Sequence, residues 1–457
     1  MSLSELLPVV LFVSVCLALM LGYPVAFTLA GVALLFAGGG IIFEAFDANL
    51  LLAYPDRVFG TMSNTTLVAV PLFVLMGVML ERSKIAEELL ENMSKACRSL
   101  PAGLGLSVVL VGAMMAASTG IVGATVVTMG LMSLPTMLRR DYDPALACGT
   151  ICATGTLGQI IPPSLALVLL GDILSSAYQQ SQLNIGVFNA KPVSVGDLFL
   201  GAIVPGLLLV LLYLLYLLVI GKWQSKRAPI IDNEEQPSTL DLLTSITPPL
   251  LLILIVLGSI ITGLATPTEA AGVGAIAATF LAWFKQQLKF QVLVEVVQST
   301  SKITAMVFAI LLGASLFSLV FRGFGGEELI HRFFEHLPGG TFTALLVVML
   351  VIFLLGFILD FIEITFVVVP LVGPAILQMG VDPIWFGIMI AINLQTSFLT
   401  PPFGFALFYL RGVAPKSIAT SAIYRGVMPF IVLQVVLLSL LAIWPGIVTW
   451  LPNILNN

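Results

Sequence analysis

Polar residues are rare inside the apolar runs of this 457-residue chain, and they gather at two corresponding places. At the first place, Ser118-Thr119-Gly120 stands in the middle of one apolar run, and Thr154-Gly155 lies in a second run that leads to Pro162-Pro163. Gly and Pro interrupt a helix and free backbone carbonyl and N–H groups, which need partners in an apolar environment. Freed carbonyls with Ser and Thr hydroxyls suit a hard cation such as Na⁺, and half-helix N-termini suit an anion. Close packing of small residues between helices is the alternative explanation of such a motif.

The second place adds acidic side chains. Asp360 and Glu363 follow Gly356 in an apolar run, and residues 393–396 (Asn-Leu-Gln-Thr) precede Pro401-Pro402 in the next run. A carboxylate at the centre of a bilayer costs roughly 2.5–3.5 kcal/mol on insertion scales, so both acids need a partner or a role. They could bind a cation, exchange protons or cap a helix end. We favour a cation-linked role for Asp360.

A sequence repeat relates the two places. Residues 107–172 match residues 346–411 without gaps at an offset of 239 positions, so that Asp143-Pro144 recurs as Asp382-Pro383. Two copies of an interrupted hydrophobic unit are typical of a secondary transporter built from inverted repeats. The repeat therefore favours a binding site over packing alone, and it predicts a carrier with its site between two halves.

Composition indicates where these elements lie. Hydrophobic residues make up 59% of the chain and charged residues 9%, and the mean hydropathy is +1.10. The surface of a soluble protein of this length would need more charged residues. We therefore expect an all-α polytopic membrane protein. The net charge of −5 argues against a nucleic-acid partner. The sequence has no phosphate-binding loop that ends in Lys-Ser/Thr and no catalytic cluster, so a membrane enzyme or a channel is the weakest alternative.

Two halves must position the polar residues: a first repeat over 1–221, a cytoplasmic linker over 222–241 and a second repeat over 242–457. Each half is expected to hold a re-entrant helical hairpin, over 102–138 and 341–378, because these runs are too long for one crossing at about 1.5 Å per residue. Each hairpin precedes a broken transmembrane helix. The remaining predicted elements are the broken helices at 144–171 and 383–410, spans near 5–21, 24–43, 61–80, 199–220, 246–263, 268–284, 303–321 and 427–450, amphipathic connectors at 82–98 and 322–337, and a polar loop at 172–196.

Charge placement predicts the orientation. With the first connector and the linker in the cytoplasm, only Arg57, Lys191, Arg322 and Arg332 of the 19 basic residues lie outside, as the positive-inside rule requires. The two halves are then inverted and both termini lie outside. Arg57, Arg322 and Arg411 could each pair with a carboxylate, but at span ends snorkelling to the interface is commoner.

Five stretches of the chain carry a family resemblance: VPLFVLMGVMLERSKIAEELL (70–90), STGIVGATVVTMGLMSLPTML (118–138), GTLGQIIPPS (155–164), TPTEAAGVGA (266–275) and NLQTSFLTPPFGFALF (393–408). They resemble the large membrane (M) subunit of TRAP transporters, the tripartite ATP-independent periplasmic carriers of bacteria and archaea, within the ion-transporter superfamily. The resemblance implies an elevator mechanism, in which a transport domain that holds both hairpins slides against a scaffold. It also implies Na⁺ coupling without an organic cofactor.

The resemblance further implies a function and partners. We expect a secondary importer of organic acid anions, such as dicarboxylates, sialic acids or keto acids, in the cytoplasmic (inner) membrane. Its partners would be a soluble periplasmic substrate-binding protein and a four-helix small membrane subunit, which we expect to be a separate polypeptide because the chain starts at the first large-subunit span. The alternative is a stand-alone Na⁺- or H⁺-coupled carboxylate symporter or antiporter of the same superfamily. The 172–196 insertion resembles a longer-looped subgroup, which leaves the substrate open.

The family's binding residues carry over by motif. One Na⁺ site would comprise Ser118, Thr119, Gly120, Thr154 and Gly155. The other would comprise Gly356, Asp360, Gln395 and Thr396. The substrate would lie between the two Na⁺ ions, against Thr125, Gly158, Pro162, Asn393 and Pro402.

Overall fold

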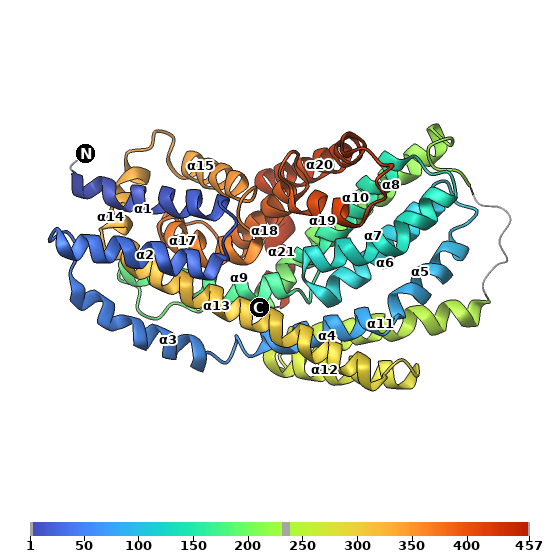
Figure 1. Cartoon of the computed structure of the whole chain (residues 1–457), viewed down its shortest axis with the longest axis horizontal. Coiled ribbons are helices and arrows are strands. Elements are labelled where there is room, and N and C mark those ends of the chain that lie inside the picture. The colour runs from blue at the N-terminus through green and yellow to red at the C-terminus, as the bar shows by residue number, and fades with distance from the viewer. Residues whose placement is uncertain (1–2, 231–237, 456–457) are drawn as a thin grey trace. The chain divides into compact units, whose positions relative to one another are not determined.

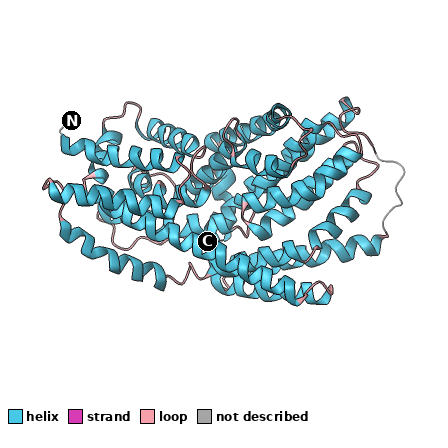
Figure 2. Cartoon of the chain, in the orientation of Figure 1, coloured by secondary structure: helices cyan, strands magenta, loops and turns pink. Residues whose placement is uncertain are grey.

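The computed structural model describes residues 3–230 and 238–455, and in this part of the chain every regular element is a helix (Figure 2). Six helices are long and apolar enough to cross a membrane, or seven if the bent pair α16 (Phe361–Val367) and α17 (Val369–Gln378) counts as one span. The six are α2 (Val25–Ile42), α7 (Val122–Arg139), α10 (Val195–Trp223), α11 (Thr239–Ile261), α13 (Phe290–Gly323) and α20 (Thr420–Ile443). The predicted all-α polytopic class is confirmed.

The helices form two compact units, and each unit takes segments from both sequence halves. Unit 1 comprises Met1–Val68, Leu169–Ser194 and Lys302–Gly387, and unit 2 comprises Ala69–Val168, Val195–Ser301 and Ile388–Asn457. The compact units therefore do not coincide with the predicted repeats 1–221 and 242–457, and the inverted repeat stays a prediction.

One aromatic contact of unit 1 lies just beyond the ends of α2 and α13. The rings of Phe46 and Phe324 lie 5.1 Å apart, and a Cβ added to Gly40 would come within 2.7 Å of Phe46. With α2 and most of α13, unit 1 contains α1 (Leu3–Met20), η1 (Ala48–Ala53), α3 (Tyr54–Ser63), most of α9 (Leu165–Asn184), α14 (Gly326–Glu335), α15 (Gly340–Leu355), α16 (Phe361–Val367) and α17 (Val369–Gln378).

In unit 2, the backbones of α8 and α20 are in close contact. A Cβ added to Gly149 would overlap the carbonyl oxygen of Gly426, so only glycine allows these two helices to approach so closely. With α7, α10, α11 and α20, unit 2 contains α4 (Ala69–Arg82), α5 (Ile85–Ala96), α6 (Gly103–Thr119), α8 (Pro144–Thr156), η2 (Leu157–Gln159), α12 (Pro267–Phe284), most of α18 (Pro383–Leu399), α19 (Phe405–Val413) and α21 (Gly446–Leu455). Figure 1 labels these helices along the chain.

The structure corrects four predicted boundaries. The predicted span 61–80 is interrupted after Ser63, because the Asn64 side chain accepts a hydrogen bond from the Thr66 N–H at 2.9 Å and competes with the helix. The predicted span 427–450 is divided before Pro445, which lacks an N–H to continue α20. Residues 172–184 continue α9 instead of forming a loop, and α13 starts at Phe290 instead of near 303. Within the predicted linker 222–241, residues 231–237 lie outside the described residues.

Candidate functional site

The first predicted hairpin is a pair of helices joined at Gly120. Two residues separate the end of α6 from the start of α7, and the φ angle of Gly120 is 62°, in the left-handed region that glycine adopts without strain. A Cβ at Gly120 would lie 2.7 Å from the backbone nitrogen of Leu165, so the tip also needs glycine to contact the start of α9. The side chains of Ser118 and Thr119 lie outside those that the structure describes.

The first predicted broken helix consists of α8, η2 and α9. Asp143 caps its start, because Oδ1 accepts a hydrogen bond from the Leu146 N–H at 2.8 Å. The helix stops after η2, and the Ser164 hydroxyl donates to the Gly158 carbonyl at 2.6 Å. One carbonyl at the break is therefore already satisfied within the protein.

The tip and the break of this first copy lie together in unit 2. A Cβ at Gly158 would lie 3.5 Å from the Ala116 carbonyl oxygen and 3.6 Å from the Gly120 Cα, so the two backbones are in van der Waals range. Gly155 faces α7, and a Cβ there would overlap the Val126 side chain. Gly120, Gly155 and Gly158 are thus brought together, while their roles as ligands stay predictions.

Two buried polar side chains near the break have no hydrogen-bond partner among the described residues. They are Thr154, through its hydroxyl, and Gln159, through both atoms of its amide. Since buried polar groups normally have partners, these atoms are available to a bound ion or water. The predicted site did not include Gln159. Its position between Gly158 and Pro162-Pro163 could have indicated that it belongs to the site.

The second predicted hairpin lies in unit 1, with Asp360 in the connection between its helices and Glu363 in the first turn of α16. α15 ends at Leu355 and α16 begins at Phe361, so Gly356 and Asp360 lie in the connection. Asp360 Oδ1 accepts from the Phe361 N–H at 2.7 Å, and Glu363 Oε2 accepts from the Asp360 N–H at 2.9 Å. The Asp360 side chain also accepts from the Glu363 N–H, and this bond and the Glu363–Asp360 bond form a capping box, which is one of the three roles expected for the acids.

The second broken helix repeats the local geometry of the first. Asp382 Oδ1 accepts from the Trp385 N–H at 2.8 Å, as Asp143 does at the start of α8. α18 ends at Leu399 and α19 resumes at Phe405. Pro401-Pro402 has a cis peptide bond, as does its repeat equivalent Pro162-Pro163. The two copies therefore share a cap and an interruption at equivalent positions.

Gln395, predicted to bind the second Na⁺, contacts the first broken helix within unit 2. Its Nε2 donates to the Thr156 hydroxyl at 3.3 Å, and these two buried residues are 239 positions apart, so they are repeat equivalents. The Tyr213 hydroxyl from α10 lies near Gln395 and accepts a hydrogen bond from Gln434 Nε2 at 2.8 Å. Sequence reasoning missed Thr156, Tyr213 and Gln434; the only signal was a polar group inside a long apolar run.

The remaining predicted residues divide between the two units. In unit 2, Thr125 is buried and its hydroxyl donates to the Ile121 carbonyl at 2.9 Å. Pro162, Asn393 and Thr396 are buried and Pro402 is exposed. Gly356 and Asp360 belong to unit 1, whereas Gln395 and Thr396 belong to unit 2. The second Na⁺ set and the substrate set stay predictions.

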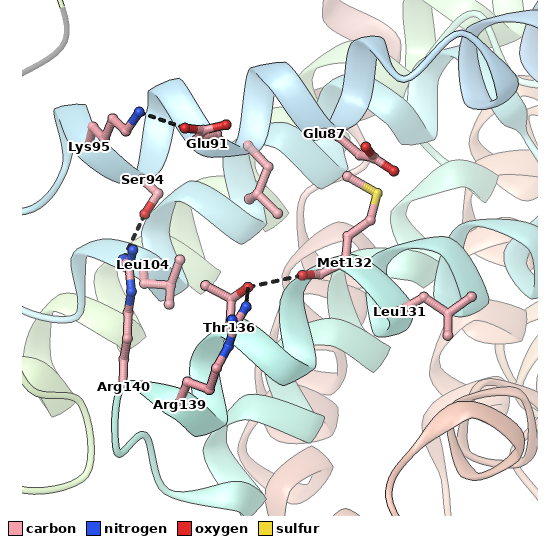
Figure 3. A pocket seen from close by; sticks show the side chains of 11 residues that line it. Glu87, Glu91, Ser94, Lys95, Leu104, Leu131, Met132, Thr136, Arg139 and Arg140 are labelled. Carbon is pink, nitrogen blue, oxygen red and sulfur yellow. Dashed lines mark hydrogen bonds and ion pairs between the residues drawn. The ribbon is translucent and has the colours of Figure 1, made fainter.

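A cavity of about 510 Å³ lies between α5, α6 and α7, and Figure 3 shows the side chains around it. Arg140 Nη1 donates to the Ser94 hydroxyl at 3.1 Å, and Lys95 pairs with Glu91 at 2.6 Å. On α7 the cavity is lined only from Leu131 onward, so it does not include the hairpin tip at Gly120. Two acidic and three basic side chains line this cavity, and no predicted site residue is among its lining residues.

Two solved transporter structures have a similar fold. The YdaH transporter of Alcanivorax borkumensis matches with a TM-score of 0.63 and 15% identity, over 88% of this chain and 90% of that chain. MtrF of Neisseria gonorrhoeae matches with a TM-score of 0.58 and 12% identity, over 86% and 83%. At such identities the likeness concerns the fold alone. With the apolar helices described above, it defines this protein as an all-helical, multi-pass membrane protein.

Residues 11–447 match the family "Tripartite ATP-independent periplasmic transporter, DctM component", and the chain belongs to this family. It is therefore a transport protein of the TRAP permease type rather than an enzyme, and the resemblance found in the sequence is confirmed.

Three relatives illustrate the range of the family. The C4-dicarboxylate TRAP transporter large permease protein DctM of Pseudomonas aeruginosa is 28% identical over 91% of this chain and 92% of its own length. The sialic acid TRAP transporter large permease protein SiaM of Vibrio cholerae is 28% identical over 95% of both chains. The isethionate TRAP transporter permease protein DctMQ of Oleidesulfovibrio alaskensis is 27% identical over 96% of this chain and 65% of its own length.

Proposed function

We propose that this chain is the large membrane subunit of a Na⁺-coupled secondary importer of an organic acid anion. The observation that carries the proposal is the family match over residues 11–447. The relatives named for C4-dicarboxylates, sialic acid and isethionate support an anionic cargo, because each of these compounds bears at least one acidic group. The importer would lie in the cytoplasmic (inner) membrane with both termini outside.

The importer would work with two partners. A soluble periplasmic protein would deliver the substrate, and a separate four-helix membrane subunit would associate with this chain. The words "tripartite" and "periplasmic" in the family description support this composition. Both hairpins would belong to a transport domain that moves against a scaffold in an elevator mechanism.

Na⁺ would be co-transported at the two hairpin tips. At the first tip, the unpartnered Thr154 hydroxyl and the backbone around Gly120 and Gly155 offer the neutral oxygen atoms that a hard cation prefers. At the second tip, Asp360 would add a negative charge, with Gly356, Gln395 and Thr396 completing the set. The substrate would bind between the ions against Thr125, Gly158, Pro162, Asn393 and Pro402.

Reconstitution tests the proposal. The chain would be purified with the small subunit encoded beside it and placed in liposomes, and the ligand would be identified by screening the neighbouring binding protein for thermal stabilisation. We expect uptake only when the loaded binding protein is outside and the Na⁺ gradient is directed inward. Uptake by this chain alone, with no response to Na⁺, would refute the proposal in favour of a stand-alone carrier.

A further inference from the structure

Unit 1 contains a cavity of about 370 Å³ that no predicted site residue lines. Its walls come mainly from α3, α9 and α13, which are labelled in Figure 1. Two arginines distant in sequence, Arg57 of α3 and Arg322 at the end of α13, meet at this cavity. The volume lies in the range of small-molecule sites. The lining also carries the hydroxyl groups of Thr61, Ser176, Ser315 and Ser318.

Arg322 is already engaged with neighbouring side chains. Its Nη2 donates to Gln180 Oε1 at 2.7 Å, and its Nε lies 3.3 Å from Glu327 Oε2. Gln180 Nε2 in turn donates to Glu327 Oε1 at 2.6 Å, which closes a triangle. Glu327 therefore offsets the charge of Arg322 and fixes its guanidinium at the cavity wall.

Arg57, unlike Arg322, has no direct side-chain partner among the described residues. Its half-buried guanidinium makes no hydrogen bond or ion pair within residues 3–230 and 238–455. Partial burial and the nearby charge of Arg322 lower the pKa of Arg57, the charge of Glu327 opposes this shift in part, and the guanidinium keeps its proton. A partly desolvated cation that has no direct ion pair is stabilised by an added anion. The guanidinium of Arg57 is thus the group in this cavity that is available to bind an anion.

Asp172 limits which anion fits. Its two carboxylate oxygens accept hydrogen bonds from the Asn64 amide at 3.1 Å each, which leaves further lone pairs able to accept. A second acidic group in the cavity would face the carboxylate of Asp172, and the only other cation, Arg322, is offset by Glu327. A ligand hydroxyl, by contrast, would find acceptors in Asp172 and in the lining hydroxyls.

We propose that this cavity binds a hydroxylated monoanion, a hydroxycarboxylate or hydroxysulfonate, with Arg57 holding the acidic group and Asp172 accepting a hydroxyl hydrogen. The inference rests on the proposed import of an organic anion and narrows its substrate class. By the predicted topology Arg57 and Arg322 face the outside, where a binding protein would release the anion. A dicarboxylate is disfavoured at this position.

Ligand-induced stabilisation of the purified complex tests the proposal without a Na⁺ gradient or binding protein. The probes are gluconate, glycerate and isethionate as hydroxylated monoanions, and succinate as the dicarboxylate, at matched ionic strength. We expect at least one hydroxylated monoanion to raise Tm with a saturable concentration dependence, and succinate to have no more effect than chloride. The proposal is overturned if none of the three monoanions exceeds chloride.

Substitutions test whether the anion that raises Tm binds in this cavity. Arg57→Gln should raise the half-maximal concentration by about tenfold or more, which is the loss of a hydrogen-bonded charge pair. Lys191→Gln removes an exposed positive charge on the same predicted side, outside the cavity, and should leave binding unchanged. Asp172→Asn should reduce the discrimination against succinate, and it serves as the second test if Arg57→Gln does not fold. Equal effects of Arg57→Gln and Lys191→Gln, or unchanged discrimination in Asp172→Asn, would contradict the assignment.

The outcomes separate this inference from the proposed function. If Na⁺-driven, binding-protein-dependent uptake is intact in Arg57→Gln with unchanged substrate affinity, the cavity assignment fails alone. If anions bind at Arg57 but the reconstituted complex shows no Na⁺-driven uptake, the proposed function fails and the site remains.

Discussion

The two hairpin tips end their helices by different chemistry. At the first tip a left-handed glycine, Gly120, turns the chain, and neutral glycine residues let the backbone of the broken helix approach closely. At the second tip Asp360 and Glu363 form a reciprocal cap with charged side chains. The repeat has thus kept the positions of the interruptions but not the groups that satisfy them.

This difference predicts different sensitivities. A site built from backbone and hydroxyl oxygens depends on close approach, because a neutral oxygen binds a cation only in short, well-placed contact. A site with a carboxylate depends more on charge. Na⁺ binding at the first tip should therefore be lost when side-chain volume is added. Na⁺ binding at the second tip should be weakened when charge is removed.

The largest effect is expected from Gly155→Leu. The new side chain would overlap Val126 of α7 and separate the first tip from its broken helix, at a cost of about 1–3 kcal/mol in stability from overpacking. Uptake in proteoliposomes should be abolished. The matched control is Gly258→Leu on α11, where an added Cβ would have no neighbour within 4 Å and which should still transport. Normal uptake by the Gly155→Leu variant would argue against the first site.

Charge removal at the second tip should be the next largest effect. Asn caps helices about as well as Asp, so Asp360→Asn keeps the cap and removes the charge. We expect the Na⁺ concentration for half-maximal uptake to rise about tenfold, which corresponds to roughly 1.4 kcal/mol. Asp382→Asn, the same change at the cap of α18, is the control and should leave Na⁺ dependence unchanged. If both variants behave like the unchanged protein, Asp360 is only a cap.

The contact between the two broken helices should contribute a moderate amount. Thr156→Val and Gln395→Leu each remove one side of the 3.3 Å hydrogen bond. A double-mutant cycle on the free energy of unfolding in mixed micelles should give a coupling of about 0.5–1.5 kcal/mol. If the two changes in the free energy of unfolding are strictly additive, the side chains of these repeat-equivalent residues do not stabilise each other.

The smallest effect is expected from Glu363→Gln. Glutamine completes a capping box as glutamate does, so the helix start should persist with a loss of only about 0.5 kcal/mol. Na⁺ dependence should stay close to that of the unchanged protein, since we assign the ion-linked role to Asp360. A shift in Na⁺ affinity as large as that of Asp360→Asn would instead make the two acids a joint ion site.

The interruptions of the helices were predictable from sequence because they depend on local residues. Gly120 lies in the Ser118-Thr119-Gly120 motif at the middle of the predicted hairpin 102–138, and the Asp-Pro pairs mark the starts of α8 and α18. These signals act over one or two turns, so a repeat of the sequence repeats the geometry. By contrast, the polar segment after residue 171 was predicted as a loop but continues α9, since polarity alone does not stop a helix rich in Leu, Ala and Gln.

Contacts between distant segments were not predictable. Nothing local links Thr156 to Gln395, or brings Arg57 to the same cavity as Arg322. The sequence indicated that Arg57 and Arg322 could each pair with a carboxylate or reach the membrane interface, but it did not place both at one cavity. A sequence pattern shows where a charge lies along a helix but not what that charge faces.

The most direct test is an experimental structure of the complex in lipid nanodiscs with Na⁺ present. The account predicts that both helical hairpins turn back inside the bilayer, at Gly120 and at the Gly356–Asp360 connection, with ion density beside Thr154. It is contradicted if α6 and α7 and their second-half counterparts each cross the bilayer completely, because the predicted ion sites would then not exist.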